Sequence, residues 1–319
     1  MNYFASKEAA GFGFKDILYE KKDWVGRITI NRPESFNCYT TSTLQELITA
    51  IDDASNDDKV GVIVLTGAGD KAFCTGGDVK EYAGTYTKSP HDYFKYMGLF
   101  AKYIESILRS GKVTIARING IAVGGGNETQ LACDLAVMAD DTYLGQVGTS
   151  VGSVACGGAT QWLSITVGDR RAREMLFLNS RIPAAKALEW GLVNRVVPRA
   201  QLDDEVAVLV KQLLDKFPEC TRYTKQQVNY WKEAAWHATV GHARDWLSTH
   251  FTTLEPYEGM QAFVEKRKVA FIGLRQKAVD DAASSEFVWG PYERACAGCG
   301  AKGIPRQFDF CGGCGARLG

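Results

Sequence analysis

Two glycine-rich stretches of this 319-residue chain carry backbone N–H groups that could hold an anion. In RINGIAVGGGNETQLACDLAVMAD (117–140), the triplet Gly124–Gly126 lies between an apolar run and an expected helix start, and Glu128 follows two residues later. In GAGDKAFCTGGD (67–78), Gly76 and Gly77 precede a second expected helix. Because N–H groups at a helix start lack acceptors, two such loops aimed at one oxygen would form an oxyanion hole. From the spacing alone, two ordinary tight turns explain the glycines equally well.

Four cysteines near the C-terminus have the spacing of a metal site. CAGCG and FCGGCG are two CxxCG knuckles, and the glycine of each permits the tight turn that brings amide groups to the thiolates. Four such thiolates form a closed tetrahedral site, typical of structural zinc, with rubredoxin-type iron as the alternative. So short a segment cannot bury a core without a metal, and a closed site leaves no position for catalysis. The predicted ligands are Cys296, Cys299, Cys311 and Cys314.

The segments that must position the glycine loops alternate between strands and helices. Residues 25–31, 60–66 and 113–118 are apolar, β-branched runs that predict strands, and the last two have the pattern of strands buried on both faces. A helix is expected between the first two strands, with caps in 41–43 and one apolar face: Leu44, Leu47, Ile48, Ile51 and Ala54. The repeated order of strand, loop and helix predicts an α/β fold with mainly parallel pairing.

From about Asp169 the pattern becomes mostly helical. Segments 203–217, 220–236 and 258–271 each have helical periodicity, whereas the small and polar residues of 278–290 predict a linker. These changes suggest four parts. They are a core at 1–200, a helical C-terminal and oligomerisation region at 201–277, a linker at 278–294 and a zinc ribbon at 295–319.

Composition narrows the possible partners. The formal net charge is zero, which gives no electrostatic reason to expect nucleic acid or an acidic membrane surface. No apolar run has the length of a membrane span, and the N-terminal residues do not form a signal peptide, so a cytoplasmic protein is expected. The glycine loops also lack the spacing of phosphate-binding or dinucleotide-binding loops. The remaining cysteines are scattered and are expected to be free thiols: Cys38, Cys74, Cys133, Cys156 and Cys220.

Several stretches together resemble the crotonase (enoyl-CoA hydratase/isomerase) superfamily. Four of them match its signature segments: NRPESFN (31–37), GAGDKAFCTGGD (67–78), ARINGIAVGGGNE (116–128) and LGQVGTSVGSVACGGATQWL (144–163). The stretch 258–268 is similar to that family's C-terminal helix, so the likeness covers about 18–274. The resemblance implies a spiral of stacked ββα units, a homo-trimer or dimer of trimers, and a bent acyl-CoA substrate.

The resemblance also assigns roles to residues. It implies that the N–H groups of Gly77 and Gly125 hold the thioester oxygen and that Glu128 acts as the acid or base. The family's hydratases use a second glutamate, but that position is Gly148 here. Dihydroxynaphthoyl-CoA synthases and related hydrolases place an aspartate slightly later, near Ala155 here. The chain therefore departs from both patterns.

Within the family, residues 57–83, 217–232 and the cysteine tail are most similar to ring-opening hydrolases. These enzymes convert 6-oxocyclohex-1-ene-1-carbonyl-CoA to 3-hydroxypimeloyl-CoA in anaerobic benzoyl-CoA degradation, by water addition and C–C bond hydrolysis. The similarity implies no catalytic cofactor, with coenzyme A as part of the substrate. The short connection between Val197 and Leu202 differs from that subgroup. The alternatives are a hydratase or ring hydrolase for a related alicyclic acyl-CoA, and a CoA-binding scaffold without catalysis.

Further residues are candidates for the same site. Candidates for the acyl pocket are Asp78, Glu81, Tyr82, Gln146, Ser153, His250 and Tyr257. For the aromatic and histidine cluster in 242–259, helix packing and trimer contacts are the alternative explanation. Lys80 and Lys266 could meet the CoA phosphates, although exposed lysines are usually only solvated.

Overall fold

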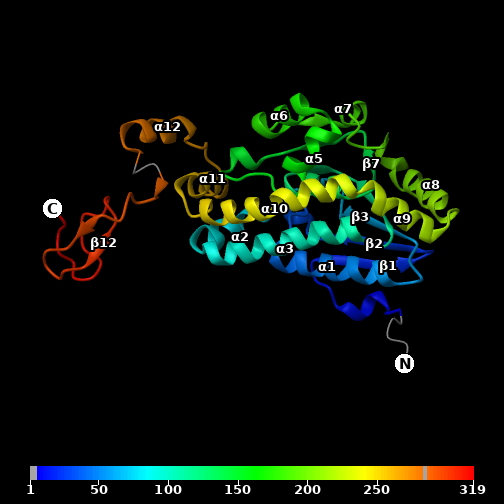
Figure 1. Cartoon of the computed structure of the whole chain (residues 1–319), viewed down its shortest axis with the longest axis horizontal. Coiled ribbons are helices and arrows are strands. Elements are labelled where there is room, and N and C mark those ends of the chain that lie inside the picture. Colours follow the sequence, from blue (N-terminus) through cyan, green and yellow to red (C-terminus); the bar gives the residue numbers. More distant parts are fainter. Residues whose placement is uncertain (1–5, 283–285) are drawn as a thin grey trace. The chain divides into compact units, whose positions relative to one another are not determined.

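The computed structural model describes residues 6–282 and 286–319, which form two compact units (Figure 1). The first unit contains residues up to Asp78, then Phe94–Thr149 and Val154–Trp246. The second unit contains Val79–Tyr93, Ser150–Ser153 and Leu247–Gly319. The boundaries expected at residues 200, 277 and 294 stay predictions.

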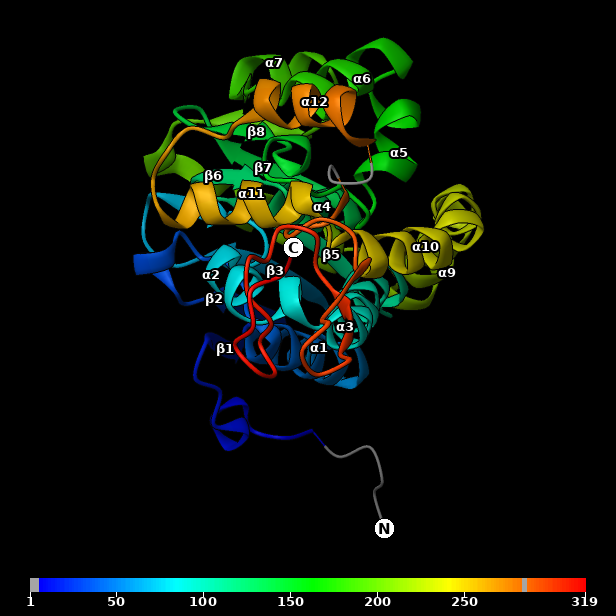
Figure 2. The ribbon, with the colours of Figure 1, turned by 90° about the vertical axis from the view of Figure 1, so that its left-hand side faces the viewer.

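The first unit is built on a six-stranded sheet, and Figure 2 labels its strands except the last. In spatial order they are β1 (Ile17–Lys22), β2 (Val25–Ile30), β3 (Val62–Gly67), β5 (Val113–Ile118), β7 (Leu135–Ala139) and β10 (Arg195–Val197). Only β1 and β2 pair antiparallel in this sheet, and the other neighbours are parallel. The predicted α/β organisation with mainly parallel pairing is confirmed.

A smaller sheet carries the strands that lead into the glycine loops. Its order is β4 (Ala72–Cys74), β6 (Ile121–Val123), β8 (Tyr143–Gly145) and β9 (Ile182–Pro183). Strands β4 and β6 pair in parallel, so their carboxyl ends meet at one edge. The sequence pattern predicts 67–78 as loop throughout, and this is wrong at β4, because three residues between glycines give too short an apolar run to identify.

The helices have the following bounds. They are α1 (Thr41–Asn56), α2 (Val79–Gly84), α3 (Pro90–Arg109), α4 (Gly125–Ala132), α5 (Ala159–Thr166), α6 (Asp169–Leu178), α7 (Ala184–Glu189), α8 (Leu202–Leu214), α9 (Pro218–Val228), α10 (Tyr230–His250), α11 (Leu254–Val264) and α12 (Phe271–Asp280). Short 3-10 helices lie at Ala9–Phe12, Pro33–Ser35, Tyr86–Lys88, Gly148–Ser150 and Arg199–Gln201.

The main sheet is covered by helices whose apolar faces the sequence indicates. The helix expected between the first two strong strands is α1, capped by Thr40 through a reciprocal bond with Thr43, and it packs on β1, β2 and β3. Helix α8 places Leu202, Val206 and Leu209 against buried residues of β3, β5 and β7. Strand β3 is buried along its whole length, as its continuous apolar run predicts.

Two helical predictions need correction. Residues 220–236 fall in two helices, because Asn229 ends α9 and α10 begins at the next residue. The segment 258–271 is also interrupted: α11 ends at Val264, and Lys266 takes a left-handed backbone with φ of 55°. Helical periodicity continues across both breaks, so it gives no signal of where the chain turns. The predicted linker likewise begins inside α12, which ends at Asp280.

The first glycine loop is held by two buried asparagines. Asn37 donates from Nδ2 to the carbonyls of Ala68 and Ala72 at 2.9 and 2.7 Å. Asn119 accepts from Gly67 N–H at 3.0 Å and donates to Gly69 O at 2.8 Å. Since buried backbone groups need partners, these amides fix the chain between β3 and β4 without regular pairing.

The second unit is assembled around aromatic rings. Tyr93 stacks on Phe251 with ring centroids 3.8 Å apart, and the Tyr82 ring meets both rings edge-on. Helix α11 approaches Ser150–Ser153 so closely that a Cβ on Gly259 would lie 2.5 Å from the Val151 carbonyl. The C-terminal tail adds a two-stranded sheet of β11 (Arg294–Ala295) and β12 (Lys302–Ile304).

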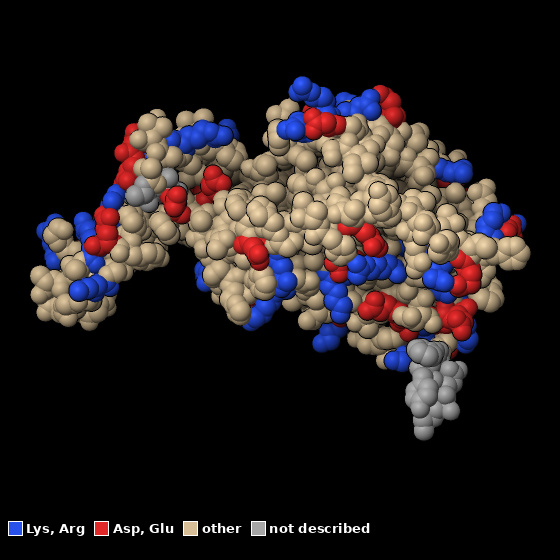
Figure 3. Space-filling view, in the orientation of Figure 1, with Lys and Arg blue, Asp and Glu red and all other residues tan. Residues whose placement is uncertain are grey.

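The surface carries both signs of charge. On the face that Figure 3 shows, basic and acidic side chains are interspersed, in keeping with the zero net charge. Among the described residues, no helix combines the length and the apolar content that crossing a membrane requires.

Candidate active site

The first glycine loop presents the Gly77 N–H away from its neighbouring strand. Tyr39 N–H donates to Gly76 O at 2.9 Å, and Asp78 N–H donates to Tyr39 O at 3.0 Å, which makes a parallel bridge between Tyr39 and Gly77. In such a bridge the middle residue bonds through neither of its own groups. Within the described chain, the Gly77 N–H has no protein acceptor.

The second glycine loop begins helix α4. Gly124 has φ 55° and ψ −129°, a backbone conformation that favours glycine. Its N–H donates to Gly145 O, and Gln146 Nε2 lies 3.4 Å from its carbonyl oxygen. Gly125 is the first residue of α4, so its N–H has no intrahelical acceptor, and the helix dipole lies behind it. The arrangement therefore favours negative charge beside Gly125.

The two loops lie too close together for side chains. A Cβ on Gly76 would lie 2.8 Å from Gly125 N, and one on Gly126 would lie 1.9 Å from Cys74 O. A Cβ on Gly125 would lie 1.6 Å from the hydroxyl oxygen of Tyr39. The structure thus brings Gly76, which precedes Gly77, against Gly125 of the other loop. It also shows a side chain that sequence reasoning missed: Tyr39, whose hydroxyl lies against Gly125.

Glu128 lies in the first turn of α4 and is only 3% exposed. Its Oε1 accepts hydrogen bonds from the N–H groups of Gly157 and Ala159, at 2.6 and 3.2 Å. Burial raises the pKa of Glu128 to about 7, and the two backbone hydrogen bonds oppose this shift. No charged side chain in the described residues is among the causes. A carboxyl group with this pKa exchanges its proton near neutral pH.

Phe100 of α3 and the segment 156–159 close the space around Glu128. A Cβ on Gly157 would lie 2.4 Å from the Phe100 ring and 2.9 Å from Glu128 Oε2. The ring of Phe100 also stacks on Tyr39, with centroids 5.7 Å apart. Phe100 and Gly157 were missed from the sequence, although the Gly157–Gly158 pair signals a close approach of the backbone. The neighbouring thiol of Cys156 is buried, which raises its pKa well above the ordinary value.

Two other predicted residues of the first unit have structural contacts. Asp78 forms an ion pair with Arg32, at 3.2 Å from Oδ2 to the guanidinium, and this fixes the residue after Gly77. Gln146 is buried and supports the second glycine loop. Gly148, at the position of the family's second glutamate, lies in a 3-10 helix.

The remaining candidates lie in the second unit. Lys80, Glu81 and Tyr82 are on α2, and Ser153 is in the short segment after Gly148. His250 ends α10 with Nε2 3.6 Å from Glu255 Oε2, and burial lowers its pKa while Glu255 opposes the shift. The last two predicted residues belong to α11 and the turn after it: Tyr257 and Lys266.

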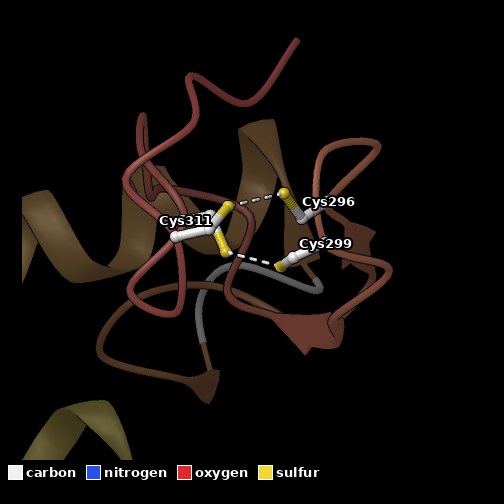
Figure 4. A group of neighbouring side chains, drawn as sticks. Cys296, Cys299 and Cys311 are labelled. Atoms are coloured by element: carbon white, nitrogen blue, oxygen red, sulfur yellow. Dashed lines mark hydrogen bonds between the residues drawn. The ribbon is translucent and has the colours of Figure 1, made fainter.

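The four C-terminal cysteines converge on one point (Figure 4). Their sulfur atoms all lie within 4.8 Å of one another, with 3.6 Å between Cys296 and Cys314 and 3.7 Å between Cys299 and Cys311. A tetrahedral zinc site with Zn–S bonds of about 2.3 Å places its sulfurs about 3.8 Å apart.

The two knuckles have the same backbone geometry. Gly300 N–H donates to Cys296 O, and Gly315 N–H donates to Cys311 O, both at 2.8 Å, with each glycine at positive φ. Four thiolates in two such turns fit a tetrahedral metal ion. The cysteines belong to the second unit, whereas Gly157 and Ala159, which bond to Glu128, belong to the first.

Comparison with known proteins points to one family. The family model for enoyl-CoA hydratase/isomerase matches residues 20–274. An enoyl-CoA hydratase from Mycobacterium avium subsp. paratuberculosis K-10 is 26% identical, with a TM-score of 0.73 over 81% of this chain and 98% of that one. The enoyl-CoA hydratase of Bacillus anthracis is 31% identical, with a TM-score of 0.65 over 80% and 98%. An enoyl-CoA hydratase/isomerase from Xanthobacter autotrophicus Py2 is 27% identical, with a TM-score of 0.71 over 84% and 94%.

The raised pKa of Glu128 predicts a pH-dependent effect of replacing it. The ordinary pKa is 4.5, so between pH 4.5 and about 7 the folded chain holds a proton that the unfolded chain has lost. Stability contributed by the native carboxyl therefore falls as pH rises through this window. We expect Glu128→Gln, which stays neutral, to gain on the order of 3 kcal/mol relative to the native chain between pH 4.5 and 8.

Urea unfolding of both proteins across this pH range measures the difference. Glu174→Gln, at an exposed position of α6, is the matched control and should give a constant difference. A constant difference for Glu128→Gln would contradict the assignment of a buried, uncompensated carboxyl group.

Proposed function

The chain belongs to the enoyl-CoA hydratase/isomerase family, and we propose that it opens the ring of a cyclic oxo-acyl-CoA. The proposed substrate is 6-oxocyclohex-1-ene-1-carbonyl-CoA and the product 3-hydroxypimeloyl-CoA, a conversion belonging to anaerobic breakdown of aromatic acids. The observation that carries the proposal is the buried carboxyl of Glu128 near the N–H groups of Gly77 and Gly125, for which the described residues provide no acceptor, with Gly148 at the position of the second glutamate.

The proposed reaction consumes two water molecules and needs no oxidant or reductant. First, a water oxygen bonds to C2 of the ring, the π electrons of C1=C2 move onto the thioester oxygen, and a proton then goes to C1. Next, a second water oxygen bonds to the ketone carbon C6, and the C1–C6 bond breaks. Its electron pair returns to the thioester as an enolate, C1 takes a proton, and C6 becomes a carboxylate.

Both steps place negative charge on the thioester oxygen, so one oxyanion hole serves them both. In this proposal the N–H groups of Gly77 and Gly125 hold that oxygen, and the start of α4 adds its dipole. Such donors stabilise the enolate more than the ground-state thioester, which is the condition for faster reaction.

Glu128 is the proposed acid–base group. As a carboxylate it takes a proton from attacking water, and as an acid it returns the proton to C1. A pKa of about 7 keeps both forms populated near neutral pH, which suits one group that performs both transfers. The proposed acyl-pocket and CoA contacts in the second unit remain those predicted from the sequence, with Lys80 and Lys266 for the CoA phosphates.

A second candidate is hydration of a related alicyclic enoyl-CoA without ring opening. The solved structures named above as enoyl-CoA hydratases favour it. A scaffold without catalysis is disfavoured by Glu128, since a buried carboxyl without a cation costs stability and has no packing advantage over an apolar residue.

We also propose a homo-oligomer, either a trimer or a dimer of trimers. Support comes from large apolar side chains that the chain leaves exposed on α6, including Phe177 and Leu178 at 62% and 74% exposure. Such residues on neighbouring positions are typical of surfaces that a second copy covers.

Mass spectrometry in ¹⁸O-water tests the ring-opening reaction. With 6-oxocyclohex-1-ene-1-carbonyl-CoA, we expect the product to gain two waters and to carry label in its new carboxylate. Glu128→Gln should lower the rate by about 10²–10⁴-fold. A gain of one water without a labelled carboxylate would favour the hydratase alternative, and bound but unchanged thioester would favour the scaffold.

Gly125→Ala tests the oxyanion hole. The new Cβ would overlap the Tyr39 hydroxyl and displace the donor N–H, so kcat should fall on the order of 10²–10³-fold. Combining it with Tyr39→Phe removes that oxygen and should restore part of the rate. Gly241→Ala, in the open middle of α10, is the control and should be neutral. Unchanged turnover in Gly125→Ala would contradict the assigned hole.

The four-cysteine cluster is proposed to hold one structural zinc ion, with iron as the alternative. Native mass spectrometry with elemental analysis should find one metal per chain. Cys311→Ser should lose it, whereas Cys220→Ser, at an exposed free cysteine, should keep it. Because the four sulfurs complete the coordination of the metal, no position is left for catalysis, and loss of the metal should leave the enzyme's turnover unchanged. A metal-free native protein would contradict the proposal.

A further inference from the structure

Tyr39 contacts both glycine loops of the candidate active site. Its backbone forms the bridge with Gly77, because its N–H donates to Gly76 O and its carbonyl accepts from Asp78 N–H, at 2.9 and 3.0 Å. Its hydroxyl oxygen lies 1.6 Å from the position that a Cβ of Gly125 would take on the other loop. One residue therefore lies against both residues whose N–H groups form the proposed oxyanion hole.

The turn before Tyr39 has a backbone conformation that residues with side chains rarely adopt. Phe36 and Asn37 both have positive φ, 52° and 53°, in the left-handed region that favours glycine. Such conformations cost energy and persist only where surrounding contacts hold them. Here Asn37 supplies those contacts, since its Nδ2 donates to the carbonyls of Ala68 and Ala72. The turn is thus tied to the first glycine loop two residues before Tyr39.

The chain after Tyr39 is anchored as well. Thr40 is the N-cap of α1 and exchanges hydrogen bonds with Thr43. The Thr43 hydroxyl also donates to Asp16 Oδ2 at 2.5 Å. Because the residues on both sides are fixed, the backbone of Tyr39 has little freedom, and a tyrosine side chain adds only two rotatable angles.

The ring of Tyr39 is buried among other aromatic rings. The Phe100 ring stacks on it with centroids 5.7 Å apart, and the Tyr103 ring meets it edge-on at 6.1 Å. Tyr39 is only 1% exposed. The Phe100 ring also packs against Gly157, whose N–H donates to Glu128. The same aromatic stack therefore contacts the second glycine loop and the segment that holds Glu128.

Glycines have no side chain with which to hold their own position. Glycine has the greatest backbone freedom of all residues, whereas donors in an oxyanion hole must be held to within about 0.5 Å. The Tyr39 hydroxyl occupies the volume that a Cβ of Gly125 would fill, and the ring carbon that bears it lies 2.8 Å from the same position. Tyr39 thus limits the movement of Gly125 in the way that a side chain of its own would.

We propose that Tyr39 is a positioning residue, which fixes the spacing of the Gly77 and Gly125 N–H groups through its backbone bridge and its buried ring. This role rests on the proposed function, because the oxyanion hole is the element on which Tyr39 acts. It requires no proton transfer, so the stacked ring is the essential part of the side chain. Without the ring the two loops would separate, and the enolate would lose more stabilisation than the substrate.

Isotope-edited infrared spectroscopy of a bound thioester tests this role without turnover. The probe is cyclohexanecarbonyl-CoA with ¹³C at the thioester carbonyl, which has neither a ring C=C to hydrate nor a ketone to hydrolyse. Hydrogen bonds from two N–H groups polarise the carbonyl and lower its stretching frequency. The native protein should lower it relative to the free probe, and Tyr39→Leu should lose most of this shift while still binding the probe.

Further variants separate positioning from folding. Tyr39→Leu should lower kcat on the order of 10²-fold with a smaller change in KM, as expected for donors displaced by about 1 Å. Tyr39→Phe keeps the stacked ring and should recover most of the infrared shift and of the rate. Phe100→Leu removes the ring that stacks on Tyr39 and should give a smaller loss of both, which keeps the test decisive if Tyr39→Leu does not fold.

Tyr19→Leu is the matched control. It removes another buried tyrosine, on strand β1, whose ring contacts the N-terminal residues Phe12 and Phe14. The variant should lose stability to urea but keep the native infrared shift.

The inference about Tyr39 and the proposed reaction fail in different ways. Tyr39→Leu or Phe100→Leu with the native infrared shift overturns the inference about Tyr39, even where ring opening occurs. Absence of a lowered band with the native protein overturns the oxyanion hole and this inference with it. Absence of ring opening in ¹⁸O-water overturns the proposed reaction, whatever the infrared shift is.

Discussion

The close approach of two backbone turns is the constraint on which this site depends. Gly76 and Gly125 lie where any Cβ would overlap the opposite loop or the Tyr39 hydroxyl. The approach follows from the small sheet, because parallel β4 and β6 deliver their carboxyl ends to one edge. Asn37 and Asn119 then hold the preceding chain through buried backbone partners. The strands and the two asparagine side chains thus set the position of the loops, and glycines without side chains stand where the loops meet.

The titratable group next to these loops is the carboxyl of Glu128, in the first turn of α4. Glu128 is buried without a cation, so its charge is disfavoured and its proton is exchanged near neutral pH. The N–H groups of Gly157 and Ala159 donate to its Oε1, and these two hydrogen bonds oppose the shift of its pKa.

The C-terminal tail is held together by local contacts. Its two knuckles are each closed by local hydrogen bonds and a glycine at positive φ, and they need no packing from the sheet. Strands β11 and β12 flank the first knuckle, an antiparallel bridge between Phe310 and Arg317 flanks the second, and the four sulfurs converge on one point. With the proposed metal bound, such a segment would gain its stability from the ion, whereas the first unit depends on the buried strands and their covering helices.

The sequence by itself determined the features that depend on local spacing. Continuous apolar runs identified β3 and β5, the helical repeat identified α1, and CxxCG spacing identified the cysteine cluster. The glycine loops were also visible, because special backbone geometry selects glycine at fixed positions, and Glu128 was singled out by the family resemblance.

Only the tertiary structure decided which side chains surround those loops. Tyr39 and Phe100 come from segments far apart in the chain, and nothing in their local sequence distinguishes them from core residues. The breaks after α9 and α11 were equally hidden, since helical periodicity continues through them. Contacts between distant segments depend on how strands and helices pack, and a linear pattern of residue types does not encode that packing explicitly.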